Sequence, residues 1–316
     1  MIIKFWGVRG SIPAPMGAHE VKEKIGWAVK KALELNLAEE GAVEQYVDGL
    51  PKHIKGTYGG NTPCVQLQSG DTTIILDAGS GIRVLGMDLM KQNFGHGKGT
   101  AHLFISHTHW DHIQGFPFFL PAHVPGNQVV VYSPFSDIQN RIETQQGARY
   151  FPVSLEALGA EIEFVSLSEG EIITVDDLSI CSIRLNHPGG SFGYRIHHEE
   201  GTFVYATDTA MDNLSEAEQE RFARFLFQAN VAVLDAQYTA KEVATQKDWG
   251  HSSLRKAIDM ALVAEVKTLV FFHHEPALND QALYERFQGA QKHLKSKHGG
   301  QRCSLIMAYE GLQLTI

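Results

Sequence analysis

The segment Ser-His-Thr-His-Trp-Asp-His at residues 106–112 constrains this 316-residue chain more than any other feature. It directly follows the apolar run His-Leu-Phe-Ile, which predicts a short buried strand. Residues two apart in an extended segment point the same way, so His107 and His109 can bind one metal ion. Asp111 and His112 stand where the chain begins to turn and can face a second ion. This density of ligand side chains at a strand end predicts a metal site rather than a solvated His-rich turn.

The other apolar segments are short and bounded by Gly, Pro or polar turn residues, which is typical of strands. They lie near residues 1–6, 64–67, 73–76, 129–132, 162–165, 172–175, 180–184 and 203–205. Helical patterns follow at 215–228, 251–265 and 280–293. Strand-rich segments that close with helices, and then repeat that order, predict two packed sheets with helices outside. We find no repeat, low-complexity tract or linker and expect a single domain over residues 1–316.

Residues from about 20 to 45 depart from this pattern. Val21, Ile25 and Val29 recur at helical spacing with Lys and Glu between them, which predicts an amphipathic helical insertion between the first two strands. The sequence leaves three roles open for the insertion: a lid over the site, packing on the sandwich, or a contact within a homodimer.

Composition excludes several classes of protein. Hydrophobic residues make up 43% of the chain and charged residues 20%, which disfavours disordered and coiled-coil proteins. The net charge of −9 repels polyanions, so we expect no long nucleic acid as partner. The three cysteines, Cys64, Cys181 and Cys303, form no Cys-x-x-Cys pair and favour a reducing, cytoplasmic location. No apolar stretch has the length of a signal peptide or membrane span, so we expect neither export nor membrane contact.

The His-x-His-x-Asp-His motif after a strand resembles the signature of metallo-β-lactamase-fold hydrolases. The resemblance implies an α/β (αββα) sandwich of two mixed β-sheets with outer helices and a metal site at one edge. It also implies three more ligands at strand ends. His187 in Asn-His-Pro, Asp208 in Thr-Asp-Thr and His273 in Phe-Phe-His-His match them, with His274 as an alternative to His273. Asp77 matches an early Asp that supports the metal loop, and a strand-to-turn cap explains it equally well.

The resemblance assigns the ligands to two divalent metal ions. His107, His109 and His187 would bind one ion, Asp111, His112 and His273 the other, and Asp208 would bridge them. Nitrogen and oxygen ligands suit zinc best, with manganese or iron as alternatives. A water between two such ions becomes hydroxide near neutral pH, which predicts a hydrolase that attacks with a metal-bridging hydroxide and uses Asp111 in catalysis. Asp208, where lactamases of this fold commonly have Cys, and His112, rather than Arg, argue against lactam hydrolysis.

Trp249-Gly-His-Ser252 resembles the Gly-His-Ser/Thr element of tRNase Z-like phosphodiesterases. That resemblance implies a catalytic His251 that donates a proton near the scissile phosphate, with Asp235 to orient it. The alternative is structural: Ser252 caps a helix and His251 packs.

Substrate contacts are less constrained. Arg9 and Arg195 could clamp a phosphate and Asn61 could line the site, although structural roles explain each of them. Phe116-Pro-Phe-Phe-Leu-Pro121 could stack a base or simply pack on the sandwich.

These observations favour a dinuclear metal phosphodiesterase of the tRNase Z-like or cyclic-nucleotide phosphodiesterase-like branch, acting on a small or cyclic nucleotide-type diester. Three alternatives remain. They are a thioester or ester hydrolase of glyoxalase II type, a tRNA or RNA 3′-processing endonuclease, and a non-catalytic metal-bound signalling module.

Overall fold

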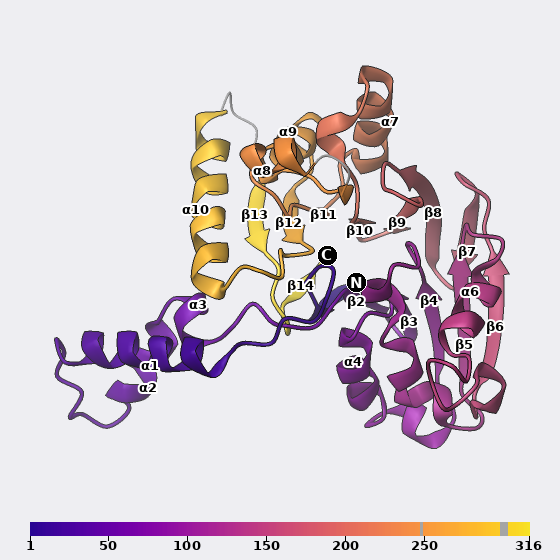
Figure 1. The fold of residues 1–316 in the computed structure, drawn as a ribbon, viewed down its shortest axis with the longest axis horizontal. Coiled ribbons are helices and arrows are strands. Elements are labelled where there is room, and N and C mark those ends of the chain that lie inside the picture. Colours follow the sequence, from indigo (N-terminus) through magenta and orange to yellow (C-terminus); the bar gives the residue numbers. More distant parts are fainter. Residues whose placement is uncertain (247–248, 298–302) are drawn as a thin grey trace.

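Two seven-stranded β-sheets form the centre of the computed structural model, which describes residues 1–246, 249–297 and 303–316 (Figure 1). The first sheet has the order β14-β1-β2-β3-β4-β5-β6 and the second β13-β12-β11-β10-β9-β8-β7. The first comprises β1 (Ile2–Gly7), β2 (Cys64–Ser69), β3 (Thr72–Leu76), β4 (Thr100–Phe104), β5 (Gln128–Ser133), β6 (Glu161–Ser166) and β14 (Gln313–Thr315). The second comprises β7 (Ile172–Val175), β8 (Leu178–Leu185), β9 (Ser191–His198), β10 (Gly201–Ala206), β11 (Val231–Asp235), β12 (Thr268–Phe272) and β13 (Ser304–Met307).

Both sheets are mixed. β3 to β6 run parallel to one another, whereas β14, β1, β2 and β3 pair antiparallel. In the second sheet β10 to β13 are parallel and β7 to β10 antiparallel.

Side chains that alternate between the two faces of each sheet form three hydrophobic cores: one between the sheets and one on the outer face of each sheet. Leu76 and Phe104 from the first sheet meet Tyr194 and Phe272 from the second in the central core. Their strand neighbour Ile75 instead points outward. Because neighbouring side chains on a strand face opposite ways, continuous apolar strands such as β3 supply two layers at once.

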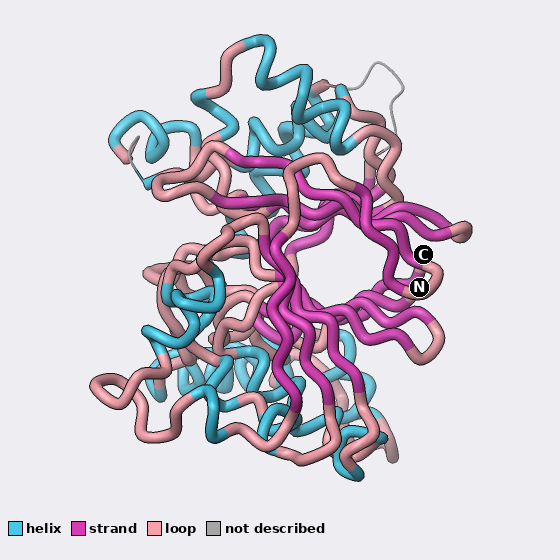
Figure 2. The backbone as a smooth tube through the Cα atoms, turned by 90° about the vertical axis from the view of Figure 1, so that its right-hand side faces the viewer, coloured by secondary structure: helices cyan, strands magenta, loops and turns pink. Residues whose placement is uncertain are grey.

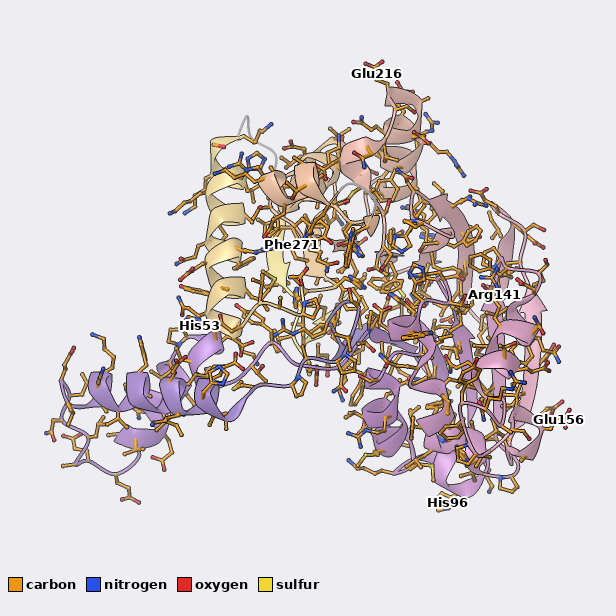
Figure 3. The ribbon with its side chains drawn as sticks, viewed as in Figure 1. His53, His96, Arg141, Glu156, Glu216 and Phe271 are labelled. Carbon is orange, nitrogen blue, oxygen red and sulfur yellow. The ribbon has the colours of Figure 1, made fainter. Side chains whose placement is uncertain are left out.

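Helices cover the outer faces (Figure 2). Residues of α4 and α6 pack on the first sheet, and residues of α7, α9 and α10 pack on the second, where Phe271 lies (Figure 3). The predicted αββα sandwich is therefore confirmed. The helices are α1 (Ala18–Ala32), α2 (Ala42–Gly49), α3 (Lys52–Lys55), α4 (Gly81–Leu89), α5 (Trp110–Ile113), α6 (Ile138–Gln145), α7 (Glu216–Leu226), α8 (Ala240–Thr245), α9 (Leu254–Val263) and α10 (Asp280–Ser296).

The insertion differs from the expected single helix. It forms two helices, α1 and α2, which extend away from the sandwich as an arm (Figure 1). Gly41 adopts a positive φ of 79° directly before α2, so the chain turns there. The apolar residues Val21, Ile25 and Val29 are exposed rather than packed on the sheets. Lys24, which pairs with Asp280 at the start of α10, ties the arm to the body.

Two further differences concern element boundaries. α9 begins at Leu254 rather than at residue 251, because Ser253 caps it by accepting a hydrogen bond from the Lys256 N–H at 3.2 Å. Ser252 instead donates to the carbonyl of Thr209. β9 escaped prediction because Gly, Ser and His interrupt its apolar pattern.

Among the described residues, no helix combines the length and apolarity needed to cross a bilayer.

Candidate metal centre

The candidate ligands follow the ends of strands that come from both sheets. His107, His109, Asp111 and His112 come after β4, and His187 follows β8. Asp208 follows β10 and His273 follows β12. The ends of strands in two facing sheets thereby bring together residues far apart in the chain.

Three residues that follow strands at this site have backbone angles in the left-handed region. The φ angles are 63° at Asp77, 57° at Asp208 and 58° at His273. Each of these residues stands one or two positions after a strand, where a sharp turn redirects the chain. Non-glycine residues at positive φ are uncommon, and such local strain clusters at functional sites.

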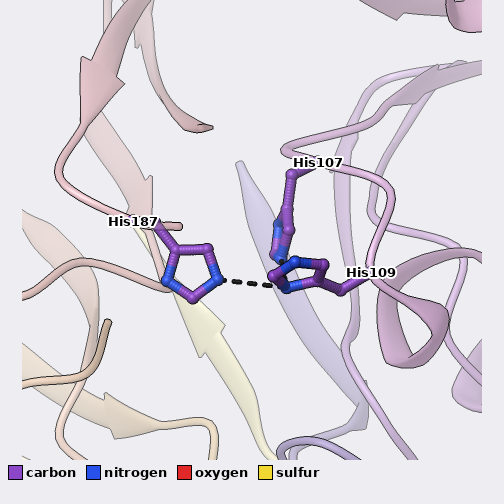
Figure 4. Close-up of side chains that lie close together, drawn as sticks. All are labelled: His107, His109 and His187. Carbon is purple, nitrogen blue, oxygen red and sulfur yellow. Dashed lines mark hydrogen bonds between the residues drawn. The ribbon is translucent and has the colours of Figure 1, made fainter. Parts of the chain in front are cut away.

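The imidazoles of His107, His109 and His187 converge, and of these three only His109 is exposed (Figure 4). Nδ1 of His109 lies 3.0 Å from Nε2 of His107 and 3.1 Å from Nε2 of His187. Tetrahedral zinc with bonds of about 2.0–2.1 Å holds its nitrogen ligands roughly 3.3 Å apart. The spacing of the three nitrogens therefore suits a single ion.

Asp208 lies at the centre of the cluster. Its Oδ1 is 3.9 Å from Nε2 of His107 and 3.8 Å from Nε2 of His187. Its carboxylate is also 3.3 Å from Nε2 of both His112 and His273. One carboxylate thus faces two groups of nitrogen ligands, as a bridging ligand must.

The second ligand group is buried. Oδ2 of Asp111 lies 3.0 Å from Nε2 of His273 and 3.3 Å from Nε2 of His112. The backbone N–H of Ser11 donates to the same Asp111 oxygen at 2.7 Å and fixes its position. Asp111, His112 and His273 form one of the clusters whose ligand atoms all lie within 4.8 Å of one another.

Outer contacts orient the imidazole rings. Nδ1 of His112 bonds Asp77 at 2.7 Å, Nδ1 of His187 bonds the carbonyl of Gly250 at 3.0 Å, and Nδ1 of His273 lies 3.2 Å from Oε1 of Gln237. With Nδ1 held in this way, each ring turns Nε2 toward the centre, and hydrogen bonds of this kind orient ligating histidines in metal sites.

Asp77 anchors this layer rather than joining the ligands. Its buried carboxylate accepts hydrogen bonds from the N–H and the hydroxyl of Ser106 at 2.7 and 2.8 Å and from the Tyr205 hydroxyl at 2.8 Å. Asp77 therefore ties the start of the His-rich segment to the second sheet.

The electrostatics of the site match the donor chemistry of a metal centre. Burial lowers the pKa of His107 well below its usual value and also lowers the pKa of His187, which favours the neutral, ligating imidazole. Burial alone would raise the pKa of Asp208, but the surrounding imidazoles outweigh it and hold that pKa well below its usual value. Burial opposes the charged form of His112, yet Asp111, Asp208 and Asp77 raise its pKa. The carboxylates thus create a site that attracts positive charge, and the donor set fits two divalent ions that share Asp208.

His251 borders both ligand groups without being one of the predicted ligands. Its Nδ1 lies 2.7 Å from Oδ2 of Asp235, and its ring stacks on His273 with centroids 4.9 Å apart. Burial lowers the pKa of His251, but Asp235 outweighs that effect and raises the pKa to about 9.

A pocket of about 510 Å³ opens onto the cluster. The pocket is lined by two tryptophans, Trp110 and Trp249, and by six titratable residues of the cluster: His109, Asp111, His187, Asp208, His251 and His273. The side chains of these tryptophans are 82% and 63% exposed. Five of the seven candidate metal ligands therefore line a pocket that a small molecule can enter.

A family model described as a beta-lactamase superfamily domain matches residues 72–274, which include every candidate metal ligand. This chain belongs to the beta-lactamase superfamily. The family expected from the His-rich motif is thereby confirmed.

Similar proteins place this superfamily member among metallo-β-lactamase-fold proteins. A ribonuclease Z of Lactobacillus johnsonii is 33% identical over 112 residues, which are 34% of this chain and 34% of the relative. The chain thus matches about a third of that relative's length. The metallo-β-lactamase-fold protein YhfI from Bacillus subtilis superposes with a TM-score of 0.64 at 17% identity, covering 99% of this chain and 98% of that one. The short form of human tRNase Z gives 0.62 at 16% identity, with 100% and 99% covered, so both likenesses show a shared fold.

The structure does not bring the three suggested substrate contacts of this superfamily member into the pocket. Nε of Arg9 donates to the carbonyl of Gly59 at 2.8 Å, and its Nη1 donates to two further carbonyls. Asn61 bonds Glu310 and accepts from Ser80. Arg195 lies on the opposite strand face from the buried Tyr194 and donates to the carbonyl of Phe225 at 2.9 Å. All three side chains hold loops or helices in place.

His273 and His274 take different positions. His273 joins the cluster, whereas Nε2 of His274 donates to the carbonyl of Ala308 at 2.8 Å. Burial lowers the pKa of His274 to about 3, so this ring is neutral and structural.

Three residues of the site, Ser11, Gln237 and Trp110, were not predicted from the sequence. Ser11 acts through its backbone N–H, which no side-chain pattern reveals. Gln237 stands two residues after Asp235 at a strand end, a weak signal. Trp110 could have been recognised as a bulky aromatic residue between two candidate ligands, His109 and Asp111.

Proposed function

We propose that this protein is a dinuclear metal-dependent phosphodiesterase that hydrolyses a small or cyclic nucleotide-type diester. The observation that carries the proposal is the position of Asp208 between two ligand groups, beside a pocket that is also lined by His251, whose Nδ1 bonds the buried Asp235.

His107, His109 and His187 would hold one ion and Asp111, His112 and His273 the other, with Asp208 shared. Two divalent ions in these positions would activate a water near neutral pH and stabilise negative charge on the attacked phosphate. Zinc fits the nitrogen-rich donor set, and manganese or iron remains compatible with its oxygen donors.

His251 would supply what a phosphodiester requires beyond the ions. The departing alkoxide is strongly basic, so a positioned imidazolium that donates a proton accelerates its departure. Asp235 bonds Nδ1 of His251 and leaves Nε2 as the proton-donating atom. Asp111 would contribute to catalysis as a ligand of the second ion, with its carboxylate held in place by the hydrogen bond from the Ser11 N–H.

A second candidate function is RNA processing. Relatives with 33% identity over part of the chain carry the name ribonuclease Z, which conflicts in part with the expectation from net charge that long nucleic acid is no partner. The linkage that RNA 3′ processing cleaves is also a phosphodiester, so the same residues would serve either substrate.

Hydrolysis of a chromogenic phosphodiester beside a matching thioester tests the proposal. Zinc-loaded and manganese-loaded protein would be compared, with His251→Ala in parallel. We expect diester turnover, and in the variant a loss of about a hundredfold or more for a diester with an alkoxide leaving group and a smaller loss for the chromogenic one. Thioester turnover alone would identify a hydrolase of glyoxalase II type, and no turnover with bound metal would indicate the signalling module.

Adding a precursor tRNA and a cyclic nucleotide to the same assay separates the two diesterase candidates. A kcat/KM for the RNA far above that for the small diesters would replace the small-diester proposal by RNA processing.

A further inference from the structure

A second pocket of about 680 Å³ adjoins the metal pocket and shares Thr108 and Trp110 with it. Its walls come from α5, from the segment after α5, from α6 and from the loop that follows α6. Four aromatic side chains line it: Trp110, Phe118, Tyr150 and Phe151. We name this pocket the aromatic subsite.

Its aromatic rings are unusually open to solvent. Trp110, Phe118 and Tyr150 are 82%, 51% and 74% exposed. Phe118 and Phe151 pack edge to face with centroids 5.3 Å apart, so they form a fixed corner rather than two independent side chains. Clustered exposed aromatic surface beside a candidate active site marks a binding surface.

The polar groups of the subsite suit a flat ligand with hydrogen-bonding edges. Gln114, Asn140 and Gln145 contribute amides, and no Asp or Glu is among the lining residues, although the chain carries a net charge of −9. Gln145 donates through Nε2 to the carbonyl of Ile113 at 2.9 Å, and its buried Oε1 has no hydrogen-bond partner within the described ranges. That oxygen is closed off from solvent, so a ligand would instead meet the exposed amide of Asn140, which can both donate and accept at the edge of a base.

Arg141 connects the subsite to the metal pocket. Its Nη1 donates to Oγ1 of Thr108 at 3.0 Å, and Thr108 lines both pockets. The guanidinium also lies 4.1 Å from the ring centre of Phe135, which fixes its plane. A ligand that spans the two pockets would therefore pass a cation on its way from the aromatic walls to the metals.

We propose that the aromatic subsite binds the nucleobase of the substrate while the adjoining metal pocket holds its phosphodiester. This inference rests on the proposed phosphodiesterase function and deepens it, because it names a nucleoside as the substrate's recognised part. The base would stack between the aromatic side chains of the walls, and amide groups would form hydrogen bonds with its edge. An acyl chain would use the apolar walls but would not use the exposed Asn140 amide.

Calorimetric titration of the zinc-loaded chain with adenosine and with thymidine tests the subsite without requiring turnover. We expect both nucleosides to bind and Trp110→Ala and Phe118→Ala each to weaken binding by about tenfold, since stacking on one aromatic ring contributes about that much. Trp110→Phe should restore much of the affinity. Trp27→Ala, which removes an exposed tryptophan of the arm, serves as the matched control and should bind like the wild type.

Kinetics supply the second readout. The kcat/KM for thymidine 5′-(p-nitrophenyl) phosphate would be divided by that for methyl p-nitrophenyl phosphate, which has the same leaving group and no base. We expect the ratio to exceed ten in the wild type and to fall by about tenfold in Phe118→Ala.

The two proposals fail in different ways. Equal kcat/KM values for the two diesters, with no nucleoside binding at millimolar concentration, would overturn the subsite and leave the phosphodiesterase standing. Nucleoside binding that all aromatic variants retain, or octanoate binding in place of nucleosides, would also overturn it. Nucleoside binding lost in the variants without turnover of any diester would overturn the proposed function alone.

Discussion

Nδ1 of His251 lies 2.7 Å from a carboxylate oxygen of Asp235; both side chains are buried, and His251 lines the metal pocket. Asp235 is held in turn, because its other oxygen accepts the N–H of Gln237 at 3.0 Å. The contact sets the ring orientation and favours a proton on the imidazole. A merely packed histidine would not need a buried carboxylate at this distance.

Replacing His251 by Ala should reduce diester hydrolysis more strongly when the leaving group is poor. A basic alkoxide needs the proton that His251 donates, whereas p-nitrophenolate departs with little help. We expect a loss of about a hundredfold or more with an alkyl leaving group and a clearly smaller loss with p-nitrophenyl. Rates for a series of leaving groups would measure the difference.

Asp235→Asn should also reduce hydrolysis most for poor leaving groups, but by less than His251→Ala does. The amide keeps the volume of the carboxylate and removes the charge that favours the imidazolium form of His251. Equal losses for good and poor leaving groups in both variants would assign His251 a structural role instead.

Asp208→Asn should reduce the bound metal to at most one ion per chain and lower turnover by more than about a hundredfold, because a neutral amide cannot bridge two cations. Elemental analysis of the purified protein and the diester assay measure the two effects. The exposed Asp71→Asn provides a control with the same chemical change in a surface turn.

Metal removal gives an independent readout of the same site. A ligand that binds the folded state alone raises the melting temperature, so a chelator should lower that of the wild type. Asp208→Asn should lose most of this response. Two ions per chain in the variant would contradict the bridging role.

The metal centre could be predicted largely from sequence because its ligands stand at strand ends within short polar motifs. His107 and His109 share one motif, and the strand before Asp208 is continuous and apolar. His187, Asp208 and His273 were expected from the resemblance to metallo-β-lactamase-fold hydrolases, and the strands that they follow belong to two facing sheets. Such sites depend little on the fine packing that a sequence does not reveal.

Arg195 shows why the remaining contacts could not be predicted in the same way. β9 carries Gly and His within its apolar pattern, so its strand character was missed. Without the strand, the alternation that buries Tyr194 and turns Arg195 outward is invisible. The Ser11 N–H reaches Asp111 across 100 residues of sequence, and the arm leaves Ile25 exposed although its spacing predicts packing.

Asp77→Ala should destabilise the fold and weaken zinc binding together. The change removes an acceptor from the Ser106 N–H, both hydroxyls and the His112 imidazole, all of which stay buried. Each orphaned donor costs about 1–3 kcal/mol, so we expect the free energy of unfolding to fall by about 3 kcal/mol or more. Zinc affinity should fall by about 10–100-fold, because His112 loses its orienting partner.

Urea denaturation of metal-free protein and zinc titration with a competing chelator measure these two quantities. Asp77→Asn keeps the volume and should retain part of the stability while zinc affinity still falls. Unchanged zinc affinity in both variants would show that Asp77 does not orient His112.

His53 links the base of the arm to α10 and should make stability depend on pH. His53 lies near the start of α10 (Figure 3). Its ring stacks on Tyr284 with centroids 4.0 Å apart, and its Nδ1 is buried without a hydrogen-bond partner within the described ranges. Burial, followed by the nearby charge of Lys24, lowers the pKa of His53 below 6.5. Below about pH 6.5 the unfolded chain therefore binds a proton that the folded chain does not, and the free energy of unfolding falls as the pH drops.

His53→Phe preserves the stacking and removes this proton uptake. We expect the variant to gain stability relative to the wild type as the pH is lowered from 7.5 to 5.5, with the gain growing steadily below 6.5. Urea denaturation of both proteins at each pH measures the difference between their free energies of unfolding, and the contributions of all other titratable groups cancel in that difference. A difference that stays constant over this range would mean that His53 takes up a proton equally in the folded and unfolded chain.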